Sequence, residues 1–477
     1  MIILIPIRRE KHRKTVDMNW SEIVKLRSRL SNSNHFVLWG MEWKNQLTKT
    51  PYLVLFIFLI TIGGGTAYAL ITITLAGDVI VEGDMTFTNG EITCTDCIDT
   101  ADILDGTITK EDLPKFLILE TIETVDTTTD FNLYSSIALA KDDIPVVSYF
   151  DDVNEDLKFV RCGSTDCSSG NSIQTIDSTG DVGRYTSIAL ADDDIPVISY
   201  QDENNNALKL VRCGNIHCSS GNLIQTVESG VGGTFTSIAI TLGDIPVISY
   251  YDWILDDLKV VKCGNTDCSS GNSIQTIDST GDVGEHTSIA LATGEIPVIS
   301  YHDNTNEDLK FVKCGNTDCS SGNSVQTIDS TGNVGWYTSI ALAAGDIPVI
   351  SYTDITNNNL KFVRCGNTDC SSGNSIQTID STAALGFYTS VSLAAGNLPV
   401  ISYFDSNNGN LKIVKCGNTD CSSGNSIQIV DSPGNVGSFS SLALADDDIP
   451  VISYLDKTNS ALKIQGFSKQ KIIDLTD

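Results

Sequence analysis

Basic residues are scarce in most of this chain. Residues 1–50 hold ten Lys and Arg against four Asp and Glu, a net charge of +6, and residues 51–75 carry no charge. Because the whole chain has a net charge of −30, residues 76–477 hold −36. A body this acidic repels phosphate backbones, and its few Lys and Arg are not clustered. The composition therefore argues against nucleic acid as a partner.

Cysteine is absent before residue 90, and most of the cysteines beyond it are regularly paired. Twelve of the fourteen form C-x4-C pairs, an even pattern that indicates disulfides and an oxidising compartment. The paired positions are Cys162 and Cys167, Cys213 and Cys218, Cys263 and Cys268, Cys314 and Cys319, Cys365 and Cys370, and Cys416 and Cys421.

One long uncharged run precedes the acidic part. Residues 51–76 are predicted to form a transmembrane signal anchor, because an apolar run of this length can span a bilayer. Lys44 and Lys49 precede the run, so the positive-inside rule predicts a basic cytoplasmic segment over residues 1–50 and an exported remainder. The pattern Ala67-Tyr68-Ala69 leaves a second interpretation open, a signal peptide whose cleavage after Ala69 would make the protein secreted.

An internal repeat fills the rest of the chain. The phrase [IL]-P-V-[IV]-S-Y occurs seven times, with its prolines 50 or 51 residues apart, from Pro145 to Pro450. One unit, from Tyr185, contains four β-rich runs, YTSIALA, IPVISY, LKLVRC and LIQTV, and none has a convincing helical period. Four strands in about 50 residues are typical of a β-propeller blade, with a solenoid as the alternative.

The first strand and the ends of the array favour the propeller. Ile188 and Leu190 face one way while Ala189 and Ala191 face the other, so both faces should be buried between stacked sheets. Repeat seven lacks a fourth strand, whereas residues 120–126 (ETIETVD) align with the fourth strand of repeat one at 171–177 (NSIQTID). A composite blade that closes a ring explains both ends, although KIIDLTD at 471–477 offers an alternative fourth strand.

The sequence thus predicts an all-β seven-bladed propeller with a composite closing blade over residues 119–477, preceded by the transmembrane helix and a β-rich spacer or stalk over 77–118. With its SIAL…PVISY…LK repeats, about three-quarters of the chain resembles extracellular bacterial and archaeal β-propeller repeat proteins that are distantly sialidase-like in fold. Such propellers include binding modules and enzymes alike. The S-x-D-x-G-x-x-W boxes usual in sialidases are absent, and Arg161, Arg212 and Arg364 occupy one repeated surface position, which argues against sialidase activity.

The C-x4-C loops are predicted to be disulfide staples of the hairpins between strands three and four, with Gly and Asn at positive φ. Zinc would need four ligands, and one hairpin offers two. The only C-x-x-C, at Cys94 and Cys97 in the spacer, is more typical of a local or interchain disulfide than of an active dithiol.

Acidic residues recur at two other places in the repeat. The turns 192–194 and 446–448, each Asp-Asp-Asp, offer ligands for Ca²⁺, with a solvated acidic turn as the alternative. No other cofactor or metal is predicted. The Asp two residues after each S-Y is present in all seven copies, so we expect it to stabilise its own turn.

Candidate ligand residues are those that differ between blades at two equivalent places. The first place precedes the aromatic residue or His that opens strand one: Leu133, Arg184, Thr234, Glu285, Trp336, Phe387 and Ser438. The second follows S-Y: Phe150, Gln201, Tyr251, His302, Thr353, Phe404 and Leu455. Both sets should surround one mouth of the central channel as exposed side chains. The predicted ligand-binding residues among them are Arg184, Tyr251, Glu285, His302, Trp336, Phe387 and Phe404.

These features predict a membrane-anchored, surface-displayed propeller that binds glycan, an envelope polymer or a protein. A propeller-fold glycan hydrolase or lyase and a purely structural envelope protein are the alternatives. Acid–base chemistry by Glu285, His286 and His302 is a weaker hypothesis, because no nucleophile or metal partner accompanies them.

Overall fold

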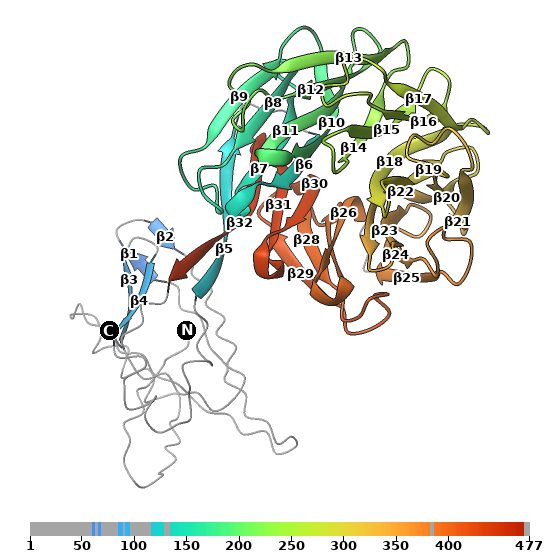
Figure 1. The fold of residues 1–477 in the computed structure, drawn as a ribbon. Helices are drawn as coiled ribbons and strands as arrows, with labels where there is room; N and C mark the ends of the chain where they lie inside the picture. Colours follow the sequence, from blue (N-terminus) through green and yellow to red (C-terminus); the bar gives the residue numbers. More distant parts are fainter. Residues whose placement is uncertain are drawn as a thin grey trace, which may run out of the picture. The chain divides into compact units, whose positions relative to one another are not determined.

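The computed structural model describes residues 116–127, 134–381 and 386–471, and four short strands nearer the N-terminus (Figure 1). The chain divides into two units, Met1–Leu113 and Pro114–Asp477. In the first unit, β1 (Ile60–Ile62) pairs with β2 (Gly65–Ala67), and β3 (Asp84–Thr88) pairs with β4 (Glu91–Thr95). The second hairpin confirms the strands predicted in MTFTNGEIT, whereas VIVEG at 79–83 lies outside the described residues.

The transmembrane helix expected over 51–76 is not shown. Within that run the structure describes only β1 and β2, and both are strands. Among the residues that the structure describes, no helix has the length and apolar character needed to cross a bilayer.

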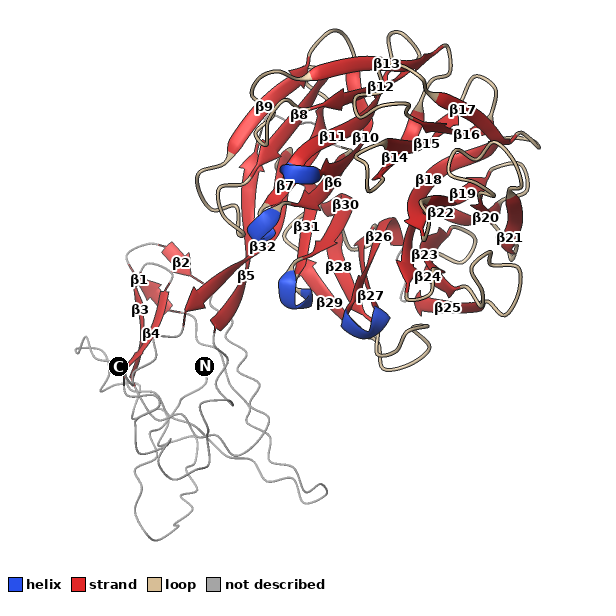
Figure 2. Cartoon of the chain, in the orientation of Figure 1, coloured by secondary structure: helices blue, strands red, loops and turns tan. Residues whose placement is uncertain are grey.

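The second unit contains seven antiparallel four-stranded sheets, the blades of a propeller (Figures 1 and 2). Blade 1 comprises β6 (Ser135–Leu139), β7 (Pro145–Asp151), β8 (Asp156–Arg161) and β9 (Ser172–Asp177); blade 2, β10 (Val182–Ala191), β11 (Ile195–Asp202), β12 (Ala207–Arg212) and β13 (Leu223–Ser229); blade 3, β14 (Thr234–Ile240), β15 (Pro246–Asp252), β16 (Asp257–Lys262) and β17 (Ser273–Asp278); blade 4, β18 (Val283–Ala292), β19 (Ile296–Asp303), β20 (Asp308–Lys313) and β21 (Ser324–Asp329). Blade 5 comprises β22 (Val334–Ala343), β23 (Ile347–Asp354), β24 (Asn359–Arg364) and β25 (Ser375–Asp380); blade 6, β26 (Gly386–Ala394), β27 (Leu398–Asp405), β28 (Asn410–Lys415) and β29 (Ser426–Asp431).

Blade 7 is the predicted composite blade. Its strand order is β30 (Val436–Leu444), β31 (Pro450–Asp456), β32 (Ala461–Lys471) and β5 (Phe116–Asp126). Strand β5 pairs with β32 from Leu462 opposite Asp126 to Lys471 opposite Phe116. The N-terminal strand therefore completes the last blade, and the alternative in which KIIDLTD does so is wrong.

The hydrophobic core consists of separate layers between neighbouring blades. Between blades 1 and 2, for example, Val146 and Phe159 pack in one cluster with Ile198 and Val211. On the first strand of blade 2, Ile188 joins this cluster and Ala191 joins the next one. Both faces of that strand are therefore packed, as the small–large alternation predicts. Because each layer needs two blades, closing the ring removes the last exposed sheet face.

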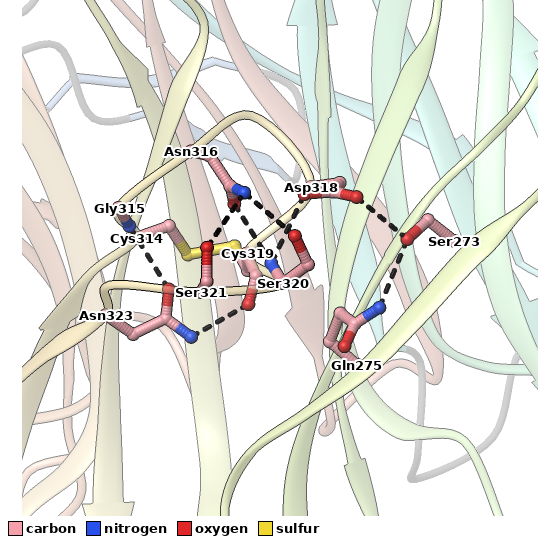
Figure 3. The surroundings of a disulfide bond; sticks show 10 residues. All are labelled: Ser273, Gln275, Cys314, Gly315, Asn316, Asp318, Cys319, Ser320, Ser321 and Asn323. Atoms are coloured by element: carbon pink, nitrogen blue, oxygen red, sulfur yellow. Dashed lines mark hydrogen bonds between the residues drawn. A yellow bond between two sulfur atoms is a disulfide. The ribbon is translucent and has the colours of Figure 1, made fainter.

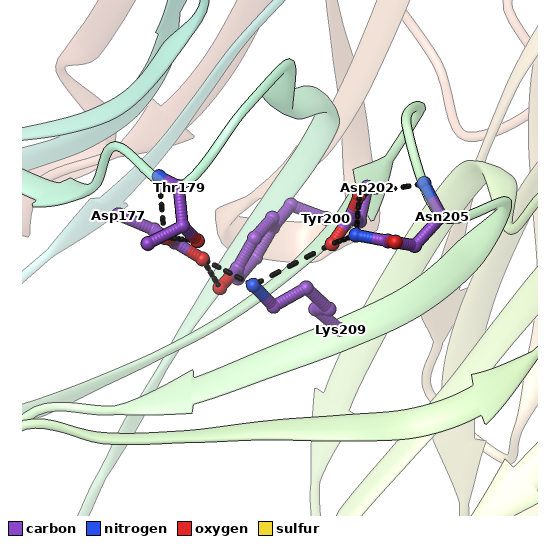
Figure 4. A network of polar contacts seen from close by, with 6 residues as sticks. All are labelled: Asp177, Thr179, Tyr200, Asp202, Asn205 and Lys209. Carbon is purple, nitrogen blue, oxygen red and sulfur yellow. Dashed lines mark hydrogen bonds and ion pairs between the residues drawn. The ribbon is translucent and has the colours of Figure 1, made fainter.

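An acidic residue at the end of each blade accepts a hydrogen bond from a Tyr and pairs with a Lys of the next blade. We call this contact a clasp, and Figure 4 shows the one between blades 1 and 2. Between blades 1 and 2, the Asp177 carboxylate accepts a hydrogen bond from Tyr200 Oη at 2.8 Å and pairs with Lys209 Nζ at 2.5 Å. Burial opposes ionisation of Asp177, but the hydrogen bonds from Lys209, Thr179 and Tyr200 hold its pKa below the usual value. The Tyr, Lys and acidic residues of the repeat thus join each blade to the next.

Equivalent clasps occur at all seven junctions, with Glu228 in place of Asp between blades 2 and 3. At the closure, Asp126 of β5 accepts a hydrogen bond from Tyr149 and pairs with Lys158, both from blade 1. The Asp after each S-Y is scaffold, as predicted. Asp202 Oδ1, for example, accepts the backbone N–H of Asn205 at 3.0 Å.

All six predicted intraloop disulfides are present, from Cys162–Cys167 to Cys416–Cys421. In the blade 4 loop, the Asn316 side chain accepts the backbone N–H of Ser320 at 2.9 Å, and Asp318 accepts a hydrogen bond from Ser273 of blade 3 at 3.1 Å (Figure 3). The Gly of each S-S-G has positive φ, as predicted, but the other positive-φ residue of the loop is the second Cys rather than Asn.

Candidate functional site

Seven aromatic or His side chains, one from the start of each blade's first strand, form a closed ring around the propeller axis. Neighbouring ring centroids lie 4.3–4.7 Å apart all the way round. With the Thr or Ser that follows each of them, these side chains line a cavity of about 200 Å³. The residues of this aromatic ring are Tyr134, Tyr185, Phe235, His286, Tyr337, Tyr388 and Phe439.

The side chains of the aromatic ring stand upright along the axis. The planes of neighbours are inclined by 42–56°, close to one-seventh of a full turn, as upright rings related by seven-fold rotation would be. The tyrosine hydroxyls converge. Burial raises the pKa of Tyr337, and the hydroxyl of Tyr134, three blades away around the ring, adds to that rise. The cavity is therefore lined by aromatic carbon and by hydroxyl groups.

In blades 2 to 7, a β-bulge orients the side chain of the ring residue. In blade 2, Arg184 pairs with Gln201 and Ser187 with Ser199, so β10 carries one residue more than β11 at this point. All seven ring residues have positive φ, between 38° and 54°. Aromatic residues rarely adopt this conformation, which costs about 1–3 kcal/mol each. Strain of this kind is common at functional sites, so the ring is a candidate site.

The two sets of variable residues lie together, as predicted. Each described member of the first set pairs with a member of the second across strands one and two, for example Glu285 with His302 and Trp336 with Thr353. Leu133 lies outside the described residues. The first set and the aromatic ring define what we call the mouth of the channel.

The predicted exposure of the second set is wrong. Its members, Tyr251, His302 and Phe404 among them, are at most 6 % exposed. They lie inside strand two, before the Asp that opens the turn, and their side chains enter the layers between blades. Their ligand-binding role stays a prediction.

Arg184 is held in place by acidic neighbours. Its guanidinium forms two hydrogen bonds with Asp181, at 2.9 and 3.0 Å, and lies 3.8 Å from Asp152. It also lies over the ring of Phe150, with 4.7 Å between Cζ and the ring centroid. Arg184 is therefore neutralised and oriented at the edge of the mouth.

Glu285, across the ring in blade 4, has a different environment. No hydrogen bond or ion pair joins its half-buried carboxyl group to any residue that the structure describes. Burial, together with the charges of Asp282 and Asp256, raises its pKa to about 7. Both neighbouring carboxylates accept a hydrogen bond from Tyr251 Oη, at 2.7 and 3.1 Å.

The next two blades carry an aromatic residue at the position of Glu285, namely Trp336 and Phe387. Trp336 donates its indole N–H to Asn333 at 2.5 Å, and its ring centroid lies 5.1 Å from those of His286 and His302. Phe387 lies one blade further on, 5.3 Å from Tyr337. Trp336 and Phe387 are both half-buried and thus present part of their surface to solvent.

The two histidines of this region are neutral acceptors or packing groups. His302 is fully buried, and its Nδ1 lies 2.9 Å from the carbonyl oxygen of Val334. Burial lowers the pKa of His302, and burial and the nearby His302 lower that of His286. No Ser or Cys among the residues that the structure describes is hydrogen-bonded to either imidazole, so this geometry adds nothing to the acid–base hypothesis.

The differences between blades do not point to the aromatic ring. Its residues occur in every copy, as the scaffold residues of a repeat do. The available signal was the residue type: Tyr, Phe or His in all seven copies, where a β-branched residue would suit a strand better.

The other candidate sites are less developed. Arg161, Arg212 and Arg364 each end the third strand of a different blade, as the repeat predicts. Within the part of the chain that the structure describes, no three His, Cys, Asp or Glu residues are grouped to hold a metal. Asp194 accepts the backbone N–H of Lys141 in the neighbouring blade at 3.2 Å. Ca²⁺ binding by the acidic turns stays a prediction, and Cys97 lies outside the described residues.

Comparison with known proteins finds distant structural similarity only. No family model and no curated protein matches the chain. Among solved structures, a polysaccharide lyase described as a PL25 ulvan lyase is 12 % identical, covers 74 % of this chain and 97 % of its own, and has a TM-score of 0.48. The Aleuria aurantia lectin AAL is 12 % identical (64 % and 98 % covered, TM-score 0.41), and the NanB sialidase of Streptococcus pneumoniae 10 % (80 % and 73 %, 0.42). At these scores the similarity carries no argument about function.

Proposed function

We propose that the propeller is a glycan-binding module whose site is the mouth. The observation that carries the proposal is the aromatic cavity, with the half-buried Trp336 and Phe387 next in the chain to its lining residues Tyr337 and Tyr388. Aromatic faces suit the C–H faces of sugar rings, while tyrosine hydroxyls and the carboxyl of Glu285 can bond to sugar hydroxyls. Aromatic walls with a few polar groups are what concave ligand sites use.

The size of the cavity favours the end of a sugar chain. Ligand pockets for larger molecules usually measure about 300–1,000 Å³. A cavity of about 200 Å³ on the axis suits a single sugar unit. A chain that ended there would extend from the axis over Trp336 or Phe387.

The proposal includes display at the cell surface. The disulfides and the charge step around residues 51–76 support export, either by a membrane anchor or as a secreted protein. Protease added to intact cells should then remove the propeller and leave the basic N-terminal segment protected. A propeller that is cut only after lysis would contradict this part of the proposal.

The test of binding is a glycan and envelope-polymer array probed with the full chain, followed by product analysis of every hit. Retention without turnover supports a binding module. Turnover would favour a hydrolase or lyase, and the absence of both would favour a structural role or a protein partner.

A further inference from the structure

Beside Glu285, the mouth has more hydrogen-bond acceptors than donors. Its carboxyl group has no partner, and the nearby Asp256 and Asp282 are bonded only to neutral donors, Tyr251 and Asn304. No Lys or Arg among the residues that the structure describes forms an ion pair with any of these three carboxylates. A half-buried carboxylate without a counter-ion is costly, so this corner suits a bound cation.

A second and independent observation concerns His302, which lies directly opposite Glu285 in the strand pair. Because Nδ1 bonds to a carbonyl oxygen, which can only accept, Nδ1 carries the hydrogen and Nε2 carries a lone pair. Nε2 is buried and has no hydrogen-bond partner. Cross-strand neighbours lie on the same face of a sheet, about 4.5–5.5 Å apart at Cβ. A second acceptor without a partner therefore lies on the same face as Glu285, buried in the layer between blades 4 and 5.

The surroundings favour positive charge. Trp336 and the aromatic ring provide π faces and edges, and Trp is the best aromatic partner for a cation. Residues 76–477 carry a net charge of −36, which attracts cations from a distance. Lys457, over Phe439, belongs to blade 7 on the far side of the ring.

We propose that the mouth recognises glycans that carry a free ammonium group, with Glu285 as its counter-charge and the buried lone pair of His302 Nε2 adding to the negative potential behind Glu285. A primary ammonium has three donors and no acceptor, which matches this set of acceptors. The inference rests on the proposed glycan-binding function and names the class of glycan. An acetylated or hydroxyl analogue would leave the carboxylate without its counter-charge.

The test compares two isosteric probes, cellotetraose and 6-amino-6-deoxycellotetraose, with the full chain by calorimetry. The amine stays charged up to pH 8, since alkylammonium groups titrate near the Lys value of about 10. We expect the aminated tetramer to bind about tenfold tighter or more at pH 8. We also expect its advantage to shrink towards pH 6, as Glu285 takes up a proton.

The titratable groups that face Glu285 are Asp256, Asp282, Tyr251, Tyr337 and the two histidines. Burial lowers the pKa of His286 and His302 and raises the pKa of both tyrosines, so all four groups are shifted towards their neutral forms. The pH profile therefore reports on the carboxylates, and Glu285→Gln should abolish it.

Three variants test which residues cause the preference for the aminated tetramer. Glu285→Gln should reduce the affinity for the aminated tetramer to that for cellotetraose. His302→Phe, which places the residue found at this position in blades 1 and 6, should reduce it several-fold. Asp193→Asn removes the same charge from an exposed turn at the other end of the channel and should change nothing.

Equal affinity of the two tetramers at pH 8, or binding of neither, would overturn the inference. If other glycans of the array bind in that case, the proposed glycan-binding function stands. If no glycan binds at all, the proposed function fails with it. An amine preference that survives Glu285→Gln would also refute the assignment.

Discussion

Substitution of Asp126 by Asn tests whether the N-terminal strand closes the propeller. Asp126 accepts a hydrogen bond from Tyr149 at 2.5 Å and pairs with Lys158 at 2.5 Å, with the two charged side chains 8 % and 11 % exposed. Removing one partner of a buried ion pair costs about 3–5 kcal/mol, because the other charge stays buried. Lys158 keeps a second carboxylate, Asp151, at 3.6 Å. We therefore expect the lower end of the range, about 3 kcal/mol.

Asp278→Asn is the matched control. Asp278 clasps blade 4 to blade 3 through Tyr301 and Lys310, and Lys310 also has a second carboxylate, Asp303, at 3.6 Å. Both variants should lower the free energy of unfolding by a similar amount in denaturant titrations. Only Asp126→Asn should also speed hydrogen exchange in β5 and β32, because β5 is far from β32 in sequence, whereas β17 is joined to β16 by the loop that Cys263–Cys268 closes.

The contradicting outcome is that Asp126→Asn keeps the stability and hydrogen exchange of the parent while Asp278→Asn is destabilised. In that case β5 would not hold the ring closed.

Two further predictions concern stability. Replacing Cys314 and Cys319 by Ser should lower the free energy of unfolding by about 2 kcal/mol, the value expected for closing so short a loop, and leave the circular dichroism spectrum unchanged; loss of the β signal would show that the disulfide is required for folding. Glu285→Gln should raise the melting temperature at pH 8 and change it much less at pH 5. The reason is that a carboxyl group whose pKa is raised in the folded state, here to about 7, costs stability as the pH rises from its unfolded value towards 7; equal melting temperatures of parent and variant at pH 8 would contradict the assigned environment.

The blade architecture could be predicted from the sequence because it repeats. Seven copies of one strand pattern fix the strands, and the unmatched ends at 120–126 and 461–471 reveal the composite blade. The Tyr–Asp–Lys clasps could not be predicted in the same way. Tyr200, Lys209 and Asp177 belong to three different strands of two blades, and only the packing of one blade on the next brings them together.

The mouth could be predicted only in part. Strand order places Arg184 and Glu285 beside their partners Gln201 and His302. The burial of the partners depends on the layers between blades, which no local pattern specifies. The aromatic ring depends on a bulge with positive φ at Tyr185 and its equivalents. The sequence around these residues has the pattern of an ordinary strand and does not predict the bulge.

The proposal that the mouth binds glycan is best tested by the affinity of Trp336→Ala for the glycan that binds best in the array. Calorimetry on the parent and on this variant would be accompanied by Leu242→Ala, which removes an exposed apolar side chain from a turn at the other end of the channel. We expect Trp336→Ala to weaken binding by about 1 kcal/mol or more, with little change in melting temperature, and Leu242→Ala to bind like the parent. Parental affinity of Trp336→Ala would contradict the claim that the mouth is the binding site.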